Sequence, residues 1–103
     1  MSDRDLYAGL IRLHVLYHAA IAPIYGQEMM EELSRHGYRL SPGTLYPMLH
    51  GLEKKGYLKS SRDSSGKVTR RTYRMTAKGR RALQGAKSKV RELFGELFDD
   101  AGE

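Results

Sequence analysis

The sequence predicts a mainly α-helical fold that contains one two-stranded β-hairpin and ends in a long helix. Apolar residues recur at spacings of three and four along four separate segments, as they do on one face of a helix. Between the third and fourth of these segments, two runs rich in β-forming residues flank the turn-forming residues 63–66. The length of 103 residues suits a single domain, and a domain this small gains stability from forming an oligomer.

The first two expected helices lie before residue 37. The first spans residues 5–20 and is ended by Pro23. One face of it carries apolar residues at spacings of four, three, four and four: Leu6, Leu10, Leu13, Tyr17 and Ile21. The second helix is shorter and stops at Gly37, because glycine readily takes the left-handed conformation that ends many helices. Its periodic residues are Tyr25, Met29, Met30 and Leu33.

The third expected helix begins at Ser41, a residue type that caps helix N-termini, with Pro42 at the first helical position. It continues to Lys55, before Gly56, and its periodic apolar residues are Leu45, Met48, Leu49 and Leu52. Pro47 lacks the N–H that an interior helical residue donates, and its ring crowds the preceding turn. We therefore expect residues 41–46 to form a loose turn, with regular helix beginning only near Pro47.

The pattern changes after Gly56. Residues 57–62 and 68–75 are expected to pair as a hairpin around the turn. Side chains alternate between the two faces of a strand, so Tyr73 and Met75 should face the core, with Arg70, Thr72 and Arg74 on the opposite face.

The last expected helix is capped by Thr76 and runs to about Phe98. At about 1.5 Å per residue it is roughly 35 Å long, and Phe94 and Phe98 widen its apolar stripe. A small domain cannot cover this stripe, so we expect it to form a homodimer interface with residues of the first helix. Packing within one chain is the less favoured alternative. The expected interface residues are Leu83, Ala86, Val90, Leu93, Phe94 and Leu97.

The positive charge is concentrated in one segment. The chain has 18 Lys and Arg against 12 Asp and Glu, a net charge of +6. Residues 58–81 alone carry a net charge of +8, with Asp63 as their acidic residue. Such a block is typical of a protein that binds a polyanion, because each neutralised phosphate releases counterions. A solvated basic surface is the alternative interpretation.

Several classes of protein are disfavoured. The absence of cysteine excludes disulfides, thiolate metal sites and cysteine nucleophiles, and favours a reducing compartment, the cytoplasm. We expect no membrane association, since no apolar run approaches the roughly 20 residues of a membrane span and the first residues lack the basic character of a signal peptide. We also expect no enzyme, because neither a phosphate-binding glycine loop nor a recognisable Ser–His–acid set is present.

Three helices, a basic hairpin and a long last helix are, in this order, the elements of a winged helix-turn-helix. We expect residues 1–75 to form this domain and residues 76–98 a dimerisation helix, followed by a frayed acidic tail at 99–103. In this fold the third helix enters the DNA major groove, and the hairpin, or wing, contacts the backbone or the adjacent minor groove. The basic segment coincides with the wing, which favours DNA as the partner.

Four motifs follow one another along the chain: Tyr-Gly-Gln-Glu at 25–28, Ser-Pro-Gly-Thr-Leu-Tyr-Pro-Met-Leu at 41–49, Leu-Glu-Lys-Lys-Gly-Tyr-Leu at 52–58 and Tyr-Arg-Met-Thr-Ala-Lys-Gly-Arg at 73–80. They resemble the successive motifs of PadR-type transcriptional regulators, and the string at 41–47 is the most specific. The short C-terminus resembles the small subfamily with a single dimerisation helix. The resemblance implies a homodimer that usually represses transcription and leaves its operator when an effector binds.

We expect DNA contacts at the start and along the exposed side of the third helix and on the wing: Ser41, Gly43, Thr44, Tyr46, His50, Lys54, Lys67, Arg70 and Arg71. Hydroxyl and backbone N–H groups at a helix start bind phosphate, and long basic side chains neutralise phosphates or enter a narrow minor groove. Ser41 as a simple cap, Tyr46 as a packed aromatic and His50 as a solvent-facing residue are the alternatives. A two-fold dimer implies a near-palindromic double-stranded operator with half-sites about 34–36 Å apart.

His14 and His18 lie one turn apart, but two histidines do not make a metal site, and carboxylates at suitable spacing are missing nearby. We therefore expect no metal and no cofactor. Tyr7, His14 and Tyr17, with His18 and either Met29 or Phe94, are candidates for a pocket that binds an aromatic or amphipathic effector, with ordinary packing as the alternative. Tryptophan is absent, so drugs cannot stack between tryptophans as in some members of the family.

The sequence leaves two hypotheses for function. The favoured one is a sequence-specific, DNA-binding transcriptional regulator. The alternative is a winged-helix module that binds another protein through its apolar last helix and does not read DNA. The basic wing favours the first hypothesis.

Overall fold

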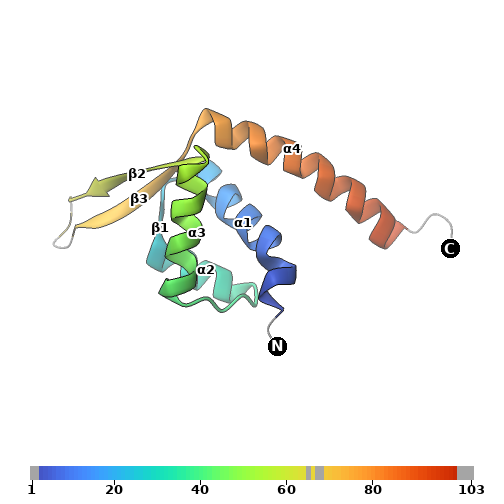
Figure 1. Cartoon of the computed structure of the whole chain (residues 1–103), viewed down its shortest axis with the longest axis horizontal. Coiled ribbons are helices and arrows are strands. Elements are labelled where there is room, and N and C mark those ends of the chain that lie inside the picture. The colour runs from blue at the N-terminus through green and yellow to red at the C-terminus, as the bar shows by residue number, and fades with distance from the viewer. Residues whose placement is uncertain (1–2, 65, 67–68, 100–103) are drawn as a thin grey trace.

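Within residues 3–64, 66 and 69–99, which the computed structural model describes, the chain forms four α-helices and three β-strands (Figure 1). The elements in order are α1 (Arg4–Ile21), β1 (Ile24–Tyr25), α2 (Gly26–Arg35), α3 (Pro42–Lys54), β2 (Leu58–Asp63), β3 (Arg70–Met75), α4 (Ala77–Phe94) and a π-helical turn η1 (Gly95–Asp99). The mainly helical fold class with a hairpin and a long last helix is confirmed.

The sheet has one strand more than the sequence predicted. β1 pairs antiparallel with β3, so the strand order is β1-β3-β2 and the hairpin is part of a three-stranded sheet. Thr72, expected to face away from the core, is buried, because it lies in the central strand between Tyr25 and Ser61. A strand of two residues is too short for an alternating pattern, which is why the sequence did not reveal β1.

The core lies where α1, α2 and α3 meet one face of the sheet. Tyr73 is fully buried, as its position on the inward face of β3 predicted, and Met75 is half-buried. Each large apolar side chain buried here contributes about 1.5–3 kcal/mol relative to an exposed one. The buried apolar residues are Ile11, Val15, Leu16, Ala19, Ile24, Met29, Leu33, Leu45, Met48, Leu49, Leu52, Leu58, Tyr73 and Leu83.

Helix α1 is apolar on two sides. Its core side carries Ile11, Val15 and Ala19, whereas four residues of the stripe identified from the sequence are exposed: Leu6, Leu10, Tyr17 and Ile21. The predicted residues do lie along one side of the helix, but most of them lie outside the core of the single chain. A surface of this kind on a small protein indicates a further contact.

The expected distortion at the start of the third helix is wrong. Regular helix begins at Pro42 and continues through Pro47. Pro47 lies in the second turn, and the carbonyl that an α-helix would pair with its missing N–H belongs to Gly43, which is exposed and can be solvated. The predicted ends are confirmed: Gly37 and Gly56 follow α2 and α3 with φ angles of 91° and 85°.

Thr76 connects the end of α3 to the start of α4. Its hydroxyl accepts a hydrogen bond from the Gly79 backbone N–H at 2.9 Å, which confirms the predicted cap, and donates to the Gly56 carbonyl at 2.6 Å. Gly79 packs directly on the Tyr57 carbonyl, so a Cβ at this position would overlap the backbone. The hairpin and α4 therefore leave the same corner of the molecule.

From this corner, α4 and the hairpin project in opposite directions, and the molecule measures 57 × 34 × 20 Å (Figure 1). Leu83 is buried in the core of its own chain and Ala86 is half-buried. The later apolar residues of α4 and η1 are exposed: Val90, Leu93, Phe94, Leu97 and Phe98. In the described part of the chain, none of the helices combines the length and apolarity that crossing a bilayer requires.

Glu53 fixes the hairpin to α3. Its Oε2 accepts hydrogen bonds from the backbone N–H and the hydroxyl of Ser60 in β2, at 3.0 and 2.7 Å. These two hydrogen bonds lower the pKa of Glu53 below its ordinary value of 4.5. This carboxylate thus adds a polar link between the hairpin and α3 to the packing of Leu58 and Tyr73 in the common core.

Gly79→Ala tests the contact between α4 and the hairpin. Alanine normally stabilises a helix by up to about 1 kcal/mol relative to glycine, but overlap with Tyr57 should reverse the sign and lower the free energy of unfolding by about 1–3 kcal/mol. Gly85→Ala in the same helix is the control, because its Cβ would meet nothing within 4 Å. Urea unfolding followed by circular dichroism measures both, and equal effects of the two substitutions would contradict the packing described.

Glu53→Gln tests the carboxylate. Because its pKa is depressed in the folded state, Glu53 stabilises the fold above its unfolded-state pKa, and this contribution is lost as the pH falls through the folded-state value. We expect Glu53→Gln to cost about 1–3 kcal/mol at neutral pH, and we expect this cost to shrink as the pH falls below 4.5 and through the folded-state pKa. The exposed Glu92, changed to Gln, is the control. A cost that does not vary with pH would argue against the ionised carboxylate as its source.

Candidate nucleic-acid interface

The exposed face of α3 opposes its core face. Leu45, Leu49 and Leu52 are buried, and Gly43, Pro47, His50 and Lys54 are all exposed. Their spacings of four, three and four place these four residues along one side of the helix. Three of them, Gly43, His50 and Lys54, are among the residues expected to contact DNA. Pro47 was missed, although the same periodicity places it on this side.

The start of α3 presents hydroxyl groups. Ser41 has an extended conformation at the N-cap position, but its hydroxyl does not cap the backbone and instead lies 3.4 Å from that of Thr44. The Ser41 carbonyl accepts the backbone N–H of Thr44 and that of Leu45. Ser41 is exposed at the positive end of a helix dipole, a setting that favours an anion.

Tyr46 occupies a different environment from the other expected contact residues. It is half-buried, and its ring packs on Gly26 at the start of α2, so closely that a Cβ on Gly26 would overlap the ring. Gly26 therefore allows α2 and α3 to approach each other. Tyr46 joins these two helices as the packed aromatic that the sequence left as an alternative.

The hairpin places like charges directly opposite each other. Lys59 lies across from Arg74, and Arg62 lies across from Arg71. Like-charged cross-strand pairs destabilise a sheet, so these pairs do not serve the stability of the fold. The sequence showed their charge but not their pairing, which depends on the register. Lys67, expected at the wing tip, lies outside the described residues.

Arg70 and Arg71 lie on opposite faces of β3. The guanidinium of Arg70 lies 4.0 Å from the centre of the Tyr25 ring, and the Tyr25 hydroxyl hydrogen-bonds the Asp63 carboxylate, which raises the pKa of Tyr25. Arg71 donates to the Ser60 hydroxyl at 3.0 Å, and Ser60 in turn bonds Glu53 of α3. Arg71 thus lies on the side of the hairpin that adjoins α3.

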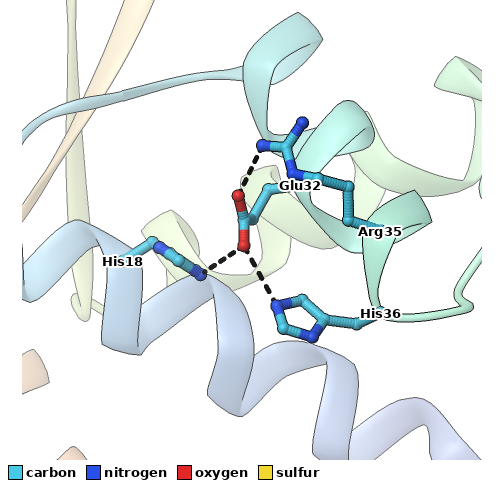
Figure 2. A network of polar contacts seen from close by, with 4 residues as sticks. All are labelled: His18, Glu32, Arg35 and His36. Carbon is cyan, nitrogen blue, oxygen red and sulfur yellow. Dashed lines mark hydrogen bonds and ion pairs between the residues drawn. The ribbon is translucent and has the colours of Figure 1, made fainter.

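A second group of polar residues lies between α1 and α2. Glu32 accepts hydrogen bonds at Oε1 from Arg35 (2.6 Å) and at Oε2 from His36 (3.0 Å), and the same Oε2 lies 3.5 Å from His18 Nε2 (Figure 2). The bond from Arg35 is the main cause of a lowered pKa of Glu32. Burial, and then the nearby His36 and His18, lower the pKa of His14.

Glu32, His36, His18 and His14 border an open pocket of about 890 Å³. Two of the expected effector residues, His14 and Tyr17, line it, together with His18 and Phe94. Tyr7 does not: it borders a separate hollow and its ring contacts Tyr38, with 6.1 Å between centroids. Met29, the alternative to Phe94, is buried in the core. The remaining lining residues are Leu10, Leu13, Glu32, His36, Leu83, Ala86, Lys87, Val90 and Arg91.

The chain is similar to known regulators along most of its length. The model of the transcriptional regulator PadR-like family matches residues 15–85. The transcriptional regulator Rv3488 of Mycobacterium tuberculosis is 46% identical over 95 residues, which are 92% of this chain and 89% of that protein.

Solved structures show the same architecture. A PadR family transcriptional regulator from Eggerthella lenta superposes with a TM-score of 0.80 at 30% identity, over 95% of this chain and 87% of the other. A PadR-like regulator from Bacillus cereus superposes with a TM-score of 0.85 over 96% and 98% of the two chains, and at 23% identity this likeness shows the fold alone. The chain therefore belongs to the PadR-like family, whose members are transcriptional regulators and not enzymes.

Proposed function

We propose that this regulator is a homodimeric repressor that binds a near-palindromic double-stranded operator in the cytoplasm. The observation that carries the proposal is the register of the hairpin, which places like charges opposite each other at two positions, Lys59 with Arg74 and Arg62 with Arg71. Two facing cations lower the stability of the sheet, whereas the phosphates of a bound nucleic acid neutralise the cations and so reduce their repulsion. Membership of a family of transcriptional regulators supports DNA as the polyanion.

In this proposal α3 enters the major groove with its exposed side, and the hairpin follows the adjacent backbone. Arg71 and Arg62 lie opposite each other on the hairpin face that adjoins α3, so both elements can reach one duplex. Arg70, on the other face, contacts the minor groove or the flanking phosphates. Tyr46 supports the site by holding α3 against α2. The proposed contact residues are Ser41, Gly43, Thr44, His50, Lys54, Lys67, Arg70 and Arg71, with Arg62 added.

The dimer is proposed to form through the exposed apolar residues of α1 and α4. One chain offers both a projecting stripe, from Val90 to Leu97, and an apolar groove between α1 and α4 that includes Leu10, Tyr17 and Phe94. A two-fold axis lets each stripe enter the groove of the other copy, which is the self-complementary contact of an isologous dimer. Leu83 contributes indirectly, because it anchors α4 to its own chain.

The effector is proposed to bind in the pocket bordered by His14, Tyr17 and Phe94. This pocket lies between α1, which packs on α2, and α4, which carries the dimer stripe. A ligand that changes the angle between these helices changes the separation of the two α3 helices. Because operator half-sites have a fixed spacing, that change lowers the affinity for DNA.

Arg62→Ala together with Arg71→Ala tests the wing. We expect weaker binding to random duplex DNA and a salt dependence of log K that is shallower by roughly 2, about one for each lost phosphate contact. Arg12→Ala with Lys89→Ala removes the same charge from α1 and α4 and is the control. Fluorescence anisotropy over a salt series measures the slope. Absence of DNA binding by the wild type would favour the protein-binding module instead.

Phe94→Glu tests the dimer. Phe94 is 59% exposed in the single chain, so the substitution should leave the protomer folded and place two buried carboxylates in the interface. We expect the variant to sediment as a monomer at micromolar concentration, where the wild type sediments as a dimer. Ser88→Glu, on another side of α4, is the control and should remain dimeric. A wild type that is monomeric under these conditions would rule out the proposed interface.

A further inference from the structure

At the side of the pocket where α1 meets the end of α2, the fold brings together more potential metal ligands than the sequence suggested. His14 and His18 are one turn apart on α1, and Glu32 and His36 are one turn apart at the end of α2. Side chains four residues apart lie on the same face of a helix. Each helix therefore presents a pair of ligand groups, and the two pairs face each other.

The distances suit a small cation. One ring nitrogen from each of His14, His18 and His36 lies within 4.8 Å of the other two. Figure 2 shows His18 and His36 directed at the same oxygen of Glu32, with Nε2–Oε2 distances of 3.5 and 3.0 Å. Bonds of about 2.0–2.1 Å in a tetrahedral zinc site place ligand atoms about 3.3 Å apart. Small side-chain rotations would bring the imidazole nitrogens from their present separations, up to 4.8 Å, to this distance.

We propose that His14, His18, His36 and Glu32 bind one divalent transition-metal ion of the Zn²⁺ type. Three imidazole nitrogens and one carboxylate oxygen are a donor set that such ions prefer, whereas Mg²⁺ and Ca²⁺ require oxygen ligands. With the ion bound, His18 and His36 would contact the ion and no longer the Glu32 carboxylate directly. The ion would thereby join α1 to the end of α2.

The surroundings of Glu32 fit this role. Arg35 holds Oε1 at 2.6 Å, so that Oε2 is the oxygen turned toward the imidazoles. Partners of this kind orient metal ligands in proteins. The side chains of His18 and Glu32 are each 25% exposed and that of His36 is 45% exposed, so an ion can enter from solvent. Lys87 and Arg91 border the same pocket and repel a cation, so binding depends on the coordinate bonds from the imidazoles and on the negative charge of Glu32.

The test is a titration of the full chain, without a histidine tag, with Co²⁺ at neutral pH. We expect one Co²⁺ per chain, the visible absorption of four-coordinate cobalt, and loss of this absorption when Zn²⁺ is added. Mg²⁺ should not displace the cobalt. Added Zn²⁺ should also raise the melting temperature, because it binds the folded state.

The four histidines of the chain provide matched variants. His14→Ala, His18→Ala, His36→Ala and Glu32→Gln should each weaken Co²⁺ binding by at least about tenfold, whereas His50→Ala, which removes the exposed histidine of α3, should not. His36 is exposed at the end of α2, so its variant should remain folded, and circular dichroism checks this. The proposal is overturned if the cobalt spectrum is absent, or if it survives the loss of His36 or of Glu32. These measurements do not involve DNA, so they stand or fall apart from the proposed function.

Discussion

The proposed DNA surface depends on the link between Glu53 of α3 and Ser60 of the hairpin. One carboxylate at the end of α3 accepts two hydrogen bonds from β2, and Ser60 lies opposite the buried Tyr73. These hydrogen bonds constrain the orientation of the hairpin relative to α3. The proposed DNA surface requires this constraint, because α3 and the wing can contact one duplex together only if their relative orientation is constant.

The hairpin illustrates a conflict between stability and function. Facing cations at Arg62 and Arg71 weaken the sheet. Favourable contacts offset this: Arg71 donates to the Ser60 hydroxyl, Arg70 lies on the Tyr25 ring, and Tyr25 hydrogen-bonds Asp63. Tyr25 of β1 thus stabilises the end of the hairpin next to the turn, where Asp63 faces Arg70, although other charges of the wing oppose pairing. Residues that break a local rule in this way are expected at functional sites.

Much of the proposed DNA surface could be predicted because it is local. The exposed side of α3 and the charge of the wing depend on neighbours in the chain, through helical periodicity and strand alternation. The sequence could not decide whether Tyr46 contacts DNA or packs, since its burial depends on Gly26, twenty residues earlier. The histidine cluster could not be predicted either: His36 joins His14 and His18 only because α2 packs across α1.

The sequence by itself determined the helices, their glycine and threonine ends, the charge of the wing and the apolar stripe of α4, because each depends on the preferences of residues close together in the chain. The tertiary structure alone decided that β1 joins the sheet, that α1 buries Ile11 and Val15 and leaves Leu6 and Leu10 exposed, and that three histidines meet. These features require contacts between segments that are distant in the sequence. Local preferences favour several arrangements equally, and only the packing of the whole chain selects one of them.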